Sequence, residues 1–393
     1  MTGGIVLAAG GTGGHLFPAQ ALGAELLRRG HEVALITDRR GHGYEDRFEG
    51  IAVHRVPAAS PTGAGIFGQF LAMTELARGT FAARRLLKTL RPRAVVGFGG
   101  YPSLPTLWAA TGAGLQSLVH ERNGLVGRVN RLLARRVDAI ALSHAQTAGL
   151  PPDLRAEVAV TGNPVRAPIL AVREVSYAPP GSDGPIRLLI LGGSQGARIL
   201  SQVVPAALAA LPPGLRRRLD VTQQCRAEDL PSVRQAYGES GIAAALSPFI
   251  EDVPARLAAT HLCITRAGAG TVAELTVAGR PAVLVPYLHA ADDHQSANAK
   301  ALAAAGAASL LPQAEFTPET LARRLEGLLG EPAALTAMAQ AARALGRPQA
   351  THALADLVTR IAIGSTCTNP AGGAAGAAGA AAAGGARLGR NAA

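Results

Sequence analysis

The chain has 393 residues, enough for two domains of ordinary size that each bury a core of their own. Its formal net charge is +11, and 36 of its 38 basic residues are arginine, the exceptions being Lys88 and Lys300. This balance favours phosphate-bearing partners or an anionic membrane surface. Because only 4% of the residues are aromatic and no nucleic-acid motif occurs, DNA and RNA are not expected as partners.

Neither end of the chain predicts a membrane span. The first residues, MTGGIVLAAGG, lack a basic stretch before the apolar run, which is typical of a first strand and not of a signal peptide. Residues 363–393 are apolar only through Ala and Gly, so we expect a disordered tail there. Cys225, Cys263 and Cys367 are too far apart for a zinc site or a disulfide framework. The protein is therefore expected to be cytosolic.

Strand-like and helix-like runs alternate along the chain, the pattern of a parallel sheet with helices on both faces. In the first half the predicted strands are residues 5–9, 33–37, 94–98, 117–121 and 138–143, and the predicted helices are 18–30, 104–114 and 126–137. The second half repeats the plan with strands at 187–193, 219–224, 262–268 and 282–287. We expect an N-terminal domain over 1–163, a Pro- and Gly-rich linker over 164–184, a C-terminal domain over 185–345, and a helix over 346–362 that returns to the first domain.

Two glycine-rich loops follow the first strand of each half, AGGTGGH at 9–15 and LGGSQGAR at 191–198. A loop of this kind aims backbone N–H groups at an anion. Neither matches the dinucleotide fingerprint, although Asp38 ends the next strand pattern and keeps a nicotinamide cofactor open for the first half. The pair predicts an α/β protein of two Rossmann-like parallel-sheet domains that face each other across a cleft.

Residues 66–93 depart from the alternating pattern. Large apolar side chains recur at helical spacing, and a run of cations without an acid follows; these residues are Phe67, Phe70, Leu71, Met73 and Phe81, then Arg78, Arg84, Arg85, Lys88, Arg91 and Arg93. Residues 1–163 carry 18 Lys plus Arg against 11 Asp plus Glu, a net of +7. A pair of helices that covers the sheet and a basic amphipathic surface for a membrane are equally open interpretations.

The densest cluster of small and polar residues is TRAGAGTVAELTVAGRPAVLVPY at 265–287. Its glycines precede a helix predicted to begin near Thr271, whose N–H groups and dipole would face a diphosphate. Glu274 lies one turn into that helix, where a carboxylate can accept hydrogen bonds from ribose hydroxyls or can simply complement the helix dipole. No Asp-x-Asp stands at a strand end, so no metal is expected, and Asp292 and Asp293 are predicted to be solvated turn residues.

Several motifs occur in an order that resembles one family of bacterial enzymes. They are AGGTGGHLFPA, FGGYPSLP, HERNGLVGRVNRLLA, TGNPVR, LGGSQGARILSQ, PFIEDV, and the cluster at 265–287 with the following HAADDHQSANA. Over about residues 5–359 the chain is similar to the MurG family of GT-B glycosyltransferases, UDP-N-acetylglucosamine transferases of peptidoglycan synthesis that act on undecaprenyl-pyrophosphoryl-MurNAc-pentapeptide.

The resemblance implies the reaction and its setting. It implies inverting transfer of GlcNAc from UDP-GlcNAc to the C4 hydroxyl of the lipid-linked MurNAc, converting lipid I to lipid II without a cofactor. It also implies peripheral attachment at the cytoplasmic face of the inner membrane, with other cell-wall synthesis proteins as possible partners. Two other functions stay open: a UDP-sugar transferase that acts on a lipid such as diacylglycerol, and a dinucleotide oxidoreductase.

The resemblance also implies residue roles. Thr12, Gly13 and Gly14 match the loop that meets the donor and acceptor pyrophosphates. The positions that match contacts to UDP-GlcNAc are Asn123, Arg166, Ser194, Ile250, Ala269, Gly270, Thr271, Val272, Ala273, Glu274 and Gln295. In that family the backbone at the Ile250 position reads uracil, and the Glu274 position holds the ribose.

Two residues are candidates for the base that deprotonates the attacking hydroxyl. His15 follows the first glycine loop, and histidine is the side-chain class suited to proton abstraction near neutral pH, which makes it the leading candidate. Glu121 is the alternative. A helix cap for His15, and pairing with Arg122 or Arg128 for Glu121, are their structural alternatives. The chain departs from the family pattern at Pro102, Ala267 and Gly270, and at Arg122, where many relatives carry Gln and where this sequence adds a cation beside Asn123.

Overall fold

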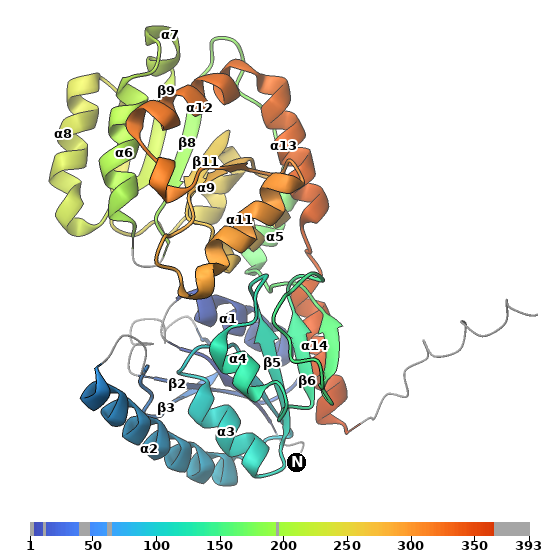
Figure 1. Ribbon diagram of the computed structural model, residues 1–393. Coiled ribbons are helices and arrows are strands. Elements are labelled where there is room, and N and C mark those ends of the chain that lie inside the picture. Colours follow the sequence, from blue (N-terminus) through green and yellow to red (C-terminus); the bar gives the residue numbers. More distant parts are fainter. Residues whose placement is uncertain (1–3, 11–12, 39–47, 61–64, 194–195, 365–393) are drawn as a thin grey trace, which may run out of the picture.

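The computed structural model describes residues 4–10, 13–38, 48–60, 65–193 and 196–364. They form two α/β domains, drawn one above the other in Figure 1, and every strand pairing within each sheet is parallel. The strand order is β3-β2-β1-β4-β5-β6-β7 in the N-terminal sheet and β10-β9-β8-β11-β12-β13 in the C-terminal sheet. The predicted pair of Rossmann-like parallel-sheet domains is confirmed.

In the N-terminal domain, helices cover both faces of the sheet. One apolar core joins the sheet to the first and last helices of the chain, and another joins its opposite face to the helices between. The strands are β1 (Ile5–Ala8), β2 (Val33–Thr37), β3 (Ala52–Arg55), β4 (Ala94–Gly97), β5 (Gln116–Glu121), β6 (Ala139–Leu142) and β7 (Glu157–Val160), and the helices are α1 (Gly13–Arg28), α2 (Ile66–Leu90), α3 (Leu104–Gly112), α4 (Arg128–Leu133) and α14 (Ala350–Ala362).

The C-terminal domain repeats this layered plan, with two further apolar cores. Its strands are β8 (Ile186–Leu191), β9 (Leu219–Gln224), β10 (Ala243–Ser247), β11 (Leu262–Thr265), β12 (Ala282–Leu284) and β13 (Ser309–Leu310). Its helices are α5 (Ala167–Arg173), α6 (Arg198–Ala209), α7 (Pro213–Arg216), α8 (Leu230–Ser240), α9 (Val253–Ala259), α10 (Ala269–Ala278), α11 (His294–Ala304), α12 (Pro318–Gly330) and α13 (Pro332–Leu345), with short 3₁₀ helices η3 (Ala227–Asp229), η4 (Ala291–Asp293) and η5 (Gln313–Glu315).

Helices α1, α2 and α4 differ from their predicted extent, and α4 covers only residues 128–133 of the predicted 126–137. Residues 66–90 form the single helix α2 and not a pair, and Gly79 serves a close approach, since a Cβ there would lie 1.9 Å from the carbonyl oxygen of Pro57. Helix α1 begins at Gly13 and carries Pro18 inside it, although the sequence predicted its start at Pro18. Proline lacks the N–H that would bond to the carbonyl four residues earlier, so Pro18 leaves the Gly14 carbonyl without its helical partner.

The strand order creates one topological switch point in each sheet. In the N-terminal sheet the order reverses between β1 and β4, and in the C-terminal sheet it reverses between β8 and β11. Chain segments that leave neighbouring strands at such a point run to opposite faces of the sheet and open a crevice at the carboxyl ends of the strands. Both glycine-rich loops, and the segment that leads into α10, therefore emerge at crevices.

The segment 164–184, expected to be a linker, contains α5, which packs against α9 and α10. Beside it lies Arg280, which is 1% exposed. Its guanidinium donates hydrogen bonds of 2.8–3.3 Å to carbonyl oxygens at the carboxyl ends of three helices, namely Val175 beyond α5, Leu257 and Ala258 in α9, and Ala278 and Gly279 at the end of α10. One buried cation thus fixes three helix ends.

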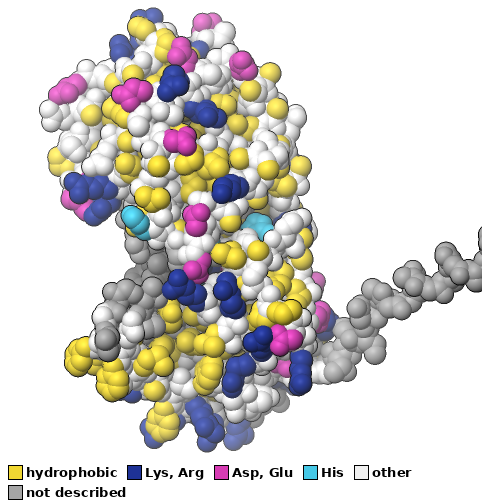
Figure 2. Space-filling view, viewed as in Figure 1, with side chains coloured by type: hydrophobic (Ala, Val, Ile, Leu, Met, Phe, Trp, Pro, Cys, Tyr) yellow, Lys and Arg dark blue, Asp and Glu magenta, His cyan; other side chains and the backbone are white. Residues whose placement is uncertain are grey.

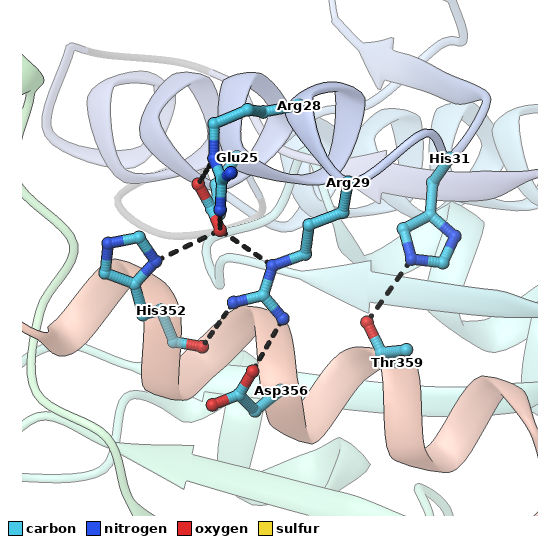
Figure 3. A network of polar contacts seen from close by, with 7 residues as sticks. All are labelled: Glu25, Arg28, Arg29, His31, His352, Asp356 and Thr359. Atoms are coloured by element: carbon cyan, nitrogen blue, oxygen red, sulfur yellow. Dashed lines mark hydrogen bonds and ion pairs between the residues drawn. The ribbon is translucent and has the colours of Figure 1, made fainter.

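Helix α14 follows the C-terminal domain in sequence but packs against α1 of the N-terminal domain (Figure 1). Figure 3 shows the polar network between them, centred on the buried Glu25. Its carboxylate accepts hydrogen bonds from Arg28 at 2.8 Å, Arg29 at 2.7 Å and His352 at 3.0 Å. Arg29 also donates to Asp356 at 2.6 Å. The hydrogen bonds from Arg28, above all, lower the pKa of Glu25 to about 2 against the opposing effect of burial.

We expect acid to loosen α14 before it unfolds the rest of the protein. Because the folded-state pKa of Glu25 is depressed, its stabilising effect is complete above the ordinary value of 4.5 and is lost as the pH falls toward about 2. Hydrogen exchange of residues 350–362, normalised to α12, should accelerate over that window, and Glu25→Gln should remove this pH dependence. Parallel exchange of α14 and α12 at every pH would contradict the assignment.

Candidate active site

A cavity of about 1160 Å³ lies between the two domains. Its N-terminal wall comes from the segments that follow β1, β4 and β5, and its C-terminal wall from those that follow β8, β9, β11 and β12. These segments include those at both switch points, so the cavity lies where the topology predicts ligand binding.

Most of the residues predicted as site residues line this cavity. They are Gly13, Gly14, His15, Glu121, Asn123, Arg166, Ile250, Ala269, Gly270, Thr271, Glu274 and Gln295. Val272 and Ala273 do not line it, because their side chains pack into the core beneath α10, and Val272 is 2% exposed. Thr12 and Ser194 lie outside the described residues.

The hydrogen bonds of His15 determine which of its ring nitrogens carries hydrogen. Its Nδ1 lies 2.8 Å from the carbonyl oxygen of Phe98, which can only accept. Its Nε2 lies 3.2 Å from a guanidinium nitrogen of Arg122, which can only donate. The two partners together specify a neutral ring with hydrogen on Nδ1 and a lone pair on Nε2. This tautomer suits a base in the cavity wall.

Glu121, the alternative base, is a buried carboxylate with four hydrogen-bond donors. Its Oε1 accepts from the backbone of Asn123 at 3.0 Å and from the Asn123 side chain at 3.3 Å. Its Oε2 accepts from the backbone of Gly127 at 2.9 Å and from Asn130 at 2.8 Å. These bonds use the usual capacity of a carboxylate. The geometry therefore gives Glu121 the task of shaping the segment between β5 and α4.

Glu274 and Arg166, both matched to donor contacts, bind each other in this structure. Arg166 donates to Oε1 of Glu274 from Nη2 at 2.9 Å and from Nε at 3.2 Å. Its guanidinium also lies 4.7 Å from the ring centre of Phe17, which belongs to the opposite wall. Burial raises the pKa of Glu274, and the charge of Arg166 opposes that effect. The pair presents a carboxylate and a cation side by side in the cavity.

The N-terminus of α10 is built to receive an anion. Its first turn contains no acidic residue and its N-cap, Gly268, makes no side-chain capping bond. A Cβ at Gly268 or Gly270 would meet no atom within 4 Å, so ligand atoms can approach the backbone closely. Unpaired N–H groups and the positive end of the helix dipole therefore face open space in the cavity.

Sequence reasoning missed several residues that shape the cavity. Gln224 fixes the second glycine loop, because it accepts from Gly192 N at 3.1 Å and donates to Gly193 O at 3.0 Å. Asn298 joins the walls by donating to Asn123 Oδ1 at 3.3 Å and accepting from Gly124 N at 3.2 Å.

The walls are also joined by an ion pair. Arg128 contacts Asp292 at 2.9 Å, so Asp292 is an interdomain partner as well as a turn residue. Asp292 and Asp293 both have positive φ angles, 53° and 51°. No signal in the sequence pairs residues so far apart along the chain.

Asp38, the residue that kept a nicotinamide cofactor open, is 2% exposed and does not line the cavity. It lies against the first glycine loop, since a Cβ at Gly10 would lie 2.6 Å from its Oδ1. A carboxylate there is not presented to a ribose in the cleft. This position removes the main argument for an oxidoreductase.

Comparisons with known proteins agree with this geometry. The model of the glycosyltransferase family 28 N-terminal domain matches residues 5–142, and that of the family 28 C-terminal domain matches residues 187–360. A relative from Rhodospirillum centenum, named UDP-N-acetylglucosamine--N-acetylmuramyl-(pentapeptide) pyrophosphoryl-undecaprenol N-acetylglucosamine transferase, is 53% identical over 90% of this chain and 93% of its own length. A protein of the same name from Paramagnetospirillum magneticum is also 53% identical, over 90% of this chain and 95% of its own length.

Among solved structures, MurG of Acinetobacter baumannii superposes with a TM-score of 0.71 at 32% identity, covering 91% of this chain and 99% of that chain. This chain belongs to the MurG family. The resemblance inferred from the ordered motifs is thereby confirmed. In this MurG-family chain, both glycosyltransferase family 28 domains contribute residues to the interdomain cavity. Among the described residues, no helix is both long and apolar enough to cross a bilayer.

Proposed function

We propose that this protein transfers GlcNAc from UDP-GlcNAc to the C4 hydroxyl of undecaprenyl-pyrophosphoryl-MurNAc-pentapeptide, with inversion at the anomeric carbon. The observation that carries the proposal is the placement of His15 and the α10 N-terminus on opposite walls of one cavity. The names of the MurG-family relatives favour this donor and acceptor over a transfer to diacylglycerol.

The arrangement supports a single displacement. The acceptor oxygen bonds to C1 of GlcNAc, the C1–O bond to UDP breaks with its electron pair on UDP, and the hydroxyl proton moves to Nε2 of His15. The α10 N–H groups stabilise the charge that develops on the diphosphate. Glu121, Glu274 and Asp292 are engaged by donors or cations, so no uncommitted carboxylate of the described cavity wall offers itself as a covalent nucleophile. A single displacement inverts C1.

We also propose that the exposed face of α2 attaches the protein to an anionic membrane. Figure 2 shows hydrophobic side chains gathered over α2, with basic side chains beside them. Phe67, Phe70 and Phe81 are 75%, 66% and 58% exposed. One face of α2 carries side chains that are three, four or seven residues apart, the spacing that places them on the same side of a helix. Their positions are 67, 71, 78, 81, 85 and 88. That face is apolar toward the N-terminus of α2 and basic toward its C-terminus, so it offers both apolar anchors and cations to an anionic lipid surface.

The reaction is tested by measuring UDP release with a soluble lipid I analogue. We expect UDP-GlcNAc to be used in preference to UDP-Glc and UDP-GalNAc, no transfer to diacylglycerol, and a β-linked product. His15→Ala should lower kcat by roughly 10²–10⁴, the usual contribution of general base catalysis, with little change in donor binding by calorimetry. Preference for another donor would refute the proposed reaction, and near-normal kcat in His15→Ala would exclude His15 as the base.

Glu274→Ala should raise the KM for UDP-GlcNAc more than it lowers kcat, because ribose hydrogen bonds are made in both the ground and transition states. The expected loss is roughly 1.5–3 kcal/mol, the range for hydrogen bonds to a charged group. Because Arg166 would lose its partner, Glu274→Gln serves as the matched variant that keeps the side-chain volume. An unchanged KM in both variants would restrict Glu274 to the helix-dipole role.

The membrane proposal is tested by vesicle cosedimentation. The protein should bind anionic but not neutral vesicles, and binding should fall with salt, since each cation near the surface contributes about 1 kcal/mol. Arg84→Glu with Arg85→Glu should abolish binding while turnover of a soluble acceptor survives. Arg234→Glu with Arg323→Glu makes the same charge change on exposed positions of the C-terminal domain and should leave binding intact. Equal binding of both double variants would exclude α2 as the attachment site.

A further inference from the structure

Arg122 is held between two acceptors at the start of α1. Its Nη1 donates to the Gly14 carbonyl, and its Nη2 lies 3.2 Å from Nε2 of His15. The Gly14 carbonyl is available because Pro18, four residues on, has no N–H to bond it. Pro18 thus creates a docking point that places the guanidinium on the candidate base.

The surroundings of Arg122 are unfavourable for its positive charge, so Arg122 does not serve only to stabilise the fold. The guanidinium lies at the N-terminus of α1, the positive end of the helix dipole, and the first turn of α1 contains no acid. Within the described part of the chain no carboxylate lies at ion-pair distance from Arg122, because its neighbour Glu121 is turned to four amide donors. Burial lowers the pKa of Arg122 to about 10, so the side chain is still a cation at neutral pH.

This concentration of positive charge is suited to an anionic ligand. Arg122 lines the interdomain cavity beside Gly13 and Gly14, whose N–H groups open α1. A diphosphate at this end of the helix would offer the guanidinium charged oxygens, which are stronger acceptors than a carbonyl or an imidazole. The competition for Arg122 would therefore be won by the diphosphate.

The same contact controls His15. A lone pair on Nε2 that already accepts a hydrogen bond from a cation is a poor proton acceptor. Removal of the guanidinium takes away this hydrogen bond and the positive charge beside the ring, and both changes make Nε2 a better proton acceptor. The reactivity of the base is thereby tied to the position of Arg122.

We propose that Arg122 is an acceptor-sensing positioning residue: it caps Nε2 of His15 until the pyrophosphate of the lipid-linked acceptor binds the guanidinium and uncovers the base. This inference rests on the proposed function, because it takes the acceptor to be a diphosphate. The proposed function places the donor diphosphate at the N-terminus of α10, on the opposite wall of the cavity. Arg122 then keeps its contact with His15 until the acceptor binds, which protects the donor from transfer to water.

Kinetics test the acceptor contact. Arg122→Gln should raise the KM for a soluble lipid I analogue roughly ten- to hundredfold, as expected for lost hydrogen bonds to a charged group, while the KM for UDP-GlcNAc changes less than about twofold. It should also increase the hydrolysis of UDP-GlcNAc in the absence of acceptor. Arg135→Gln, at an exposed arginine of the same domain, is the matched control. An unchanged acceptor KM would overturn the proposal.

The pH profile separates a capping role from a merely structural one. The dependence of kcat/KM on pH reports groups of the free enzyme, and that of kcat reports the complex. With the acceptor as the varied substrate, the rate rises with pH along an acid limb in both profiles. In the wild type, the midpoint pH of this limb should be lower for kcat/KM than for kcat. In Arg122→Gln the two midpoint pH values should coincide. Among the described residues, the charged and titratable groups that line the cavity on the same wall as His15 include Arg122 and Glu121 at the end of β5 and Tyr101 after β4, and Arg166 lies beside Phe17 of α1. Coincident midpoints already in the wild type would refute the cap.

Nuclear magnetic resonance tests the cap without turnover. In protein labelled with ¹⁵N at histidine, the His15 signals are assigned by comparison with His15→Ala. Saturation with methylenediphosphonate should shift the Nε2 signal of the wild type to the position that Arg122→Gln shows without it. If the Nε2 signal stays in place at saturation, the proposal for Arg122 is overturned, even if transfer to lipid I is confirmed. If the signal shifts but the wild type transfers no GlcNAc, only the proposed function is refuted.

Discussion

The C-terminal wall of the cavity depends on a buried arginine, Arg280, at the opposite end of the helices that form this wall. Arg280 lies among carbonyl oxygens at the carboxyl ends of α5, α9 and α10, where helix dipoles concentrate partial negative charge. These groups offset the cost of removing a guanidinium from water. Since α5 begins directly after Arg166 and α10 carries Glu274, one cation fixes the far ends of both helices. The N-terminal ends of α5 and α10 then meet at the cavity, and their movement is restricted.

The two walls of the cavity are joined by a few side-chain contacts. Asn298 binds the Asn123 side chain, Arg166 spans from Glu274 to Phe17, and Arg128 pairs with Asp292. The Arg128–Asp292 pair is largely exposed, and an exposed ion pair is worth little on its own. The union of α1 with α14 is different, because an apolar core and the buried Glu25 network act together. The buried contacts between α1 and α14 and the side-chain contacts across the cavity thus lie at different places on the N-terminal domain.

The sequence predicted the architecture because buried parallel strands are apolar runs that break into glycines. It missed β3, β7 and β10, since these strands expose side chains and show no such run, and it missed β13, which has only two residues. It also predicted most of the cavity lining, because loops at strand ends converge by topology. It could not predict the capping of His15 by Arg122, which joins residues 107 positions apart through a carbonyl that Pro18 leaves available. Arg280 was missed because arginine is normally exposed.

The crossing of α14 to the first domain has a consequence for synthesis of the chain. Leu354, Leu357, Val358 and Ile361 belong to the same core as β1, β4 and α1. On the ribosome, the N-terminal sheet therefore emerges long before the helix that completes the cover of one of its faces, and the C-terminal domain is made in between. During that interval the part of this apolar face that α1 leaves uncovered is open to water and to chaperones. The N-terminal domain therefore becomes whole only after α14 has been made, well after its own sheet is complete.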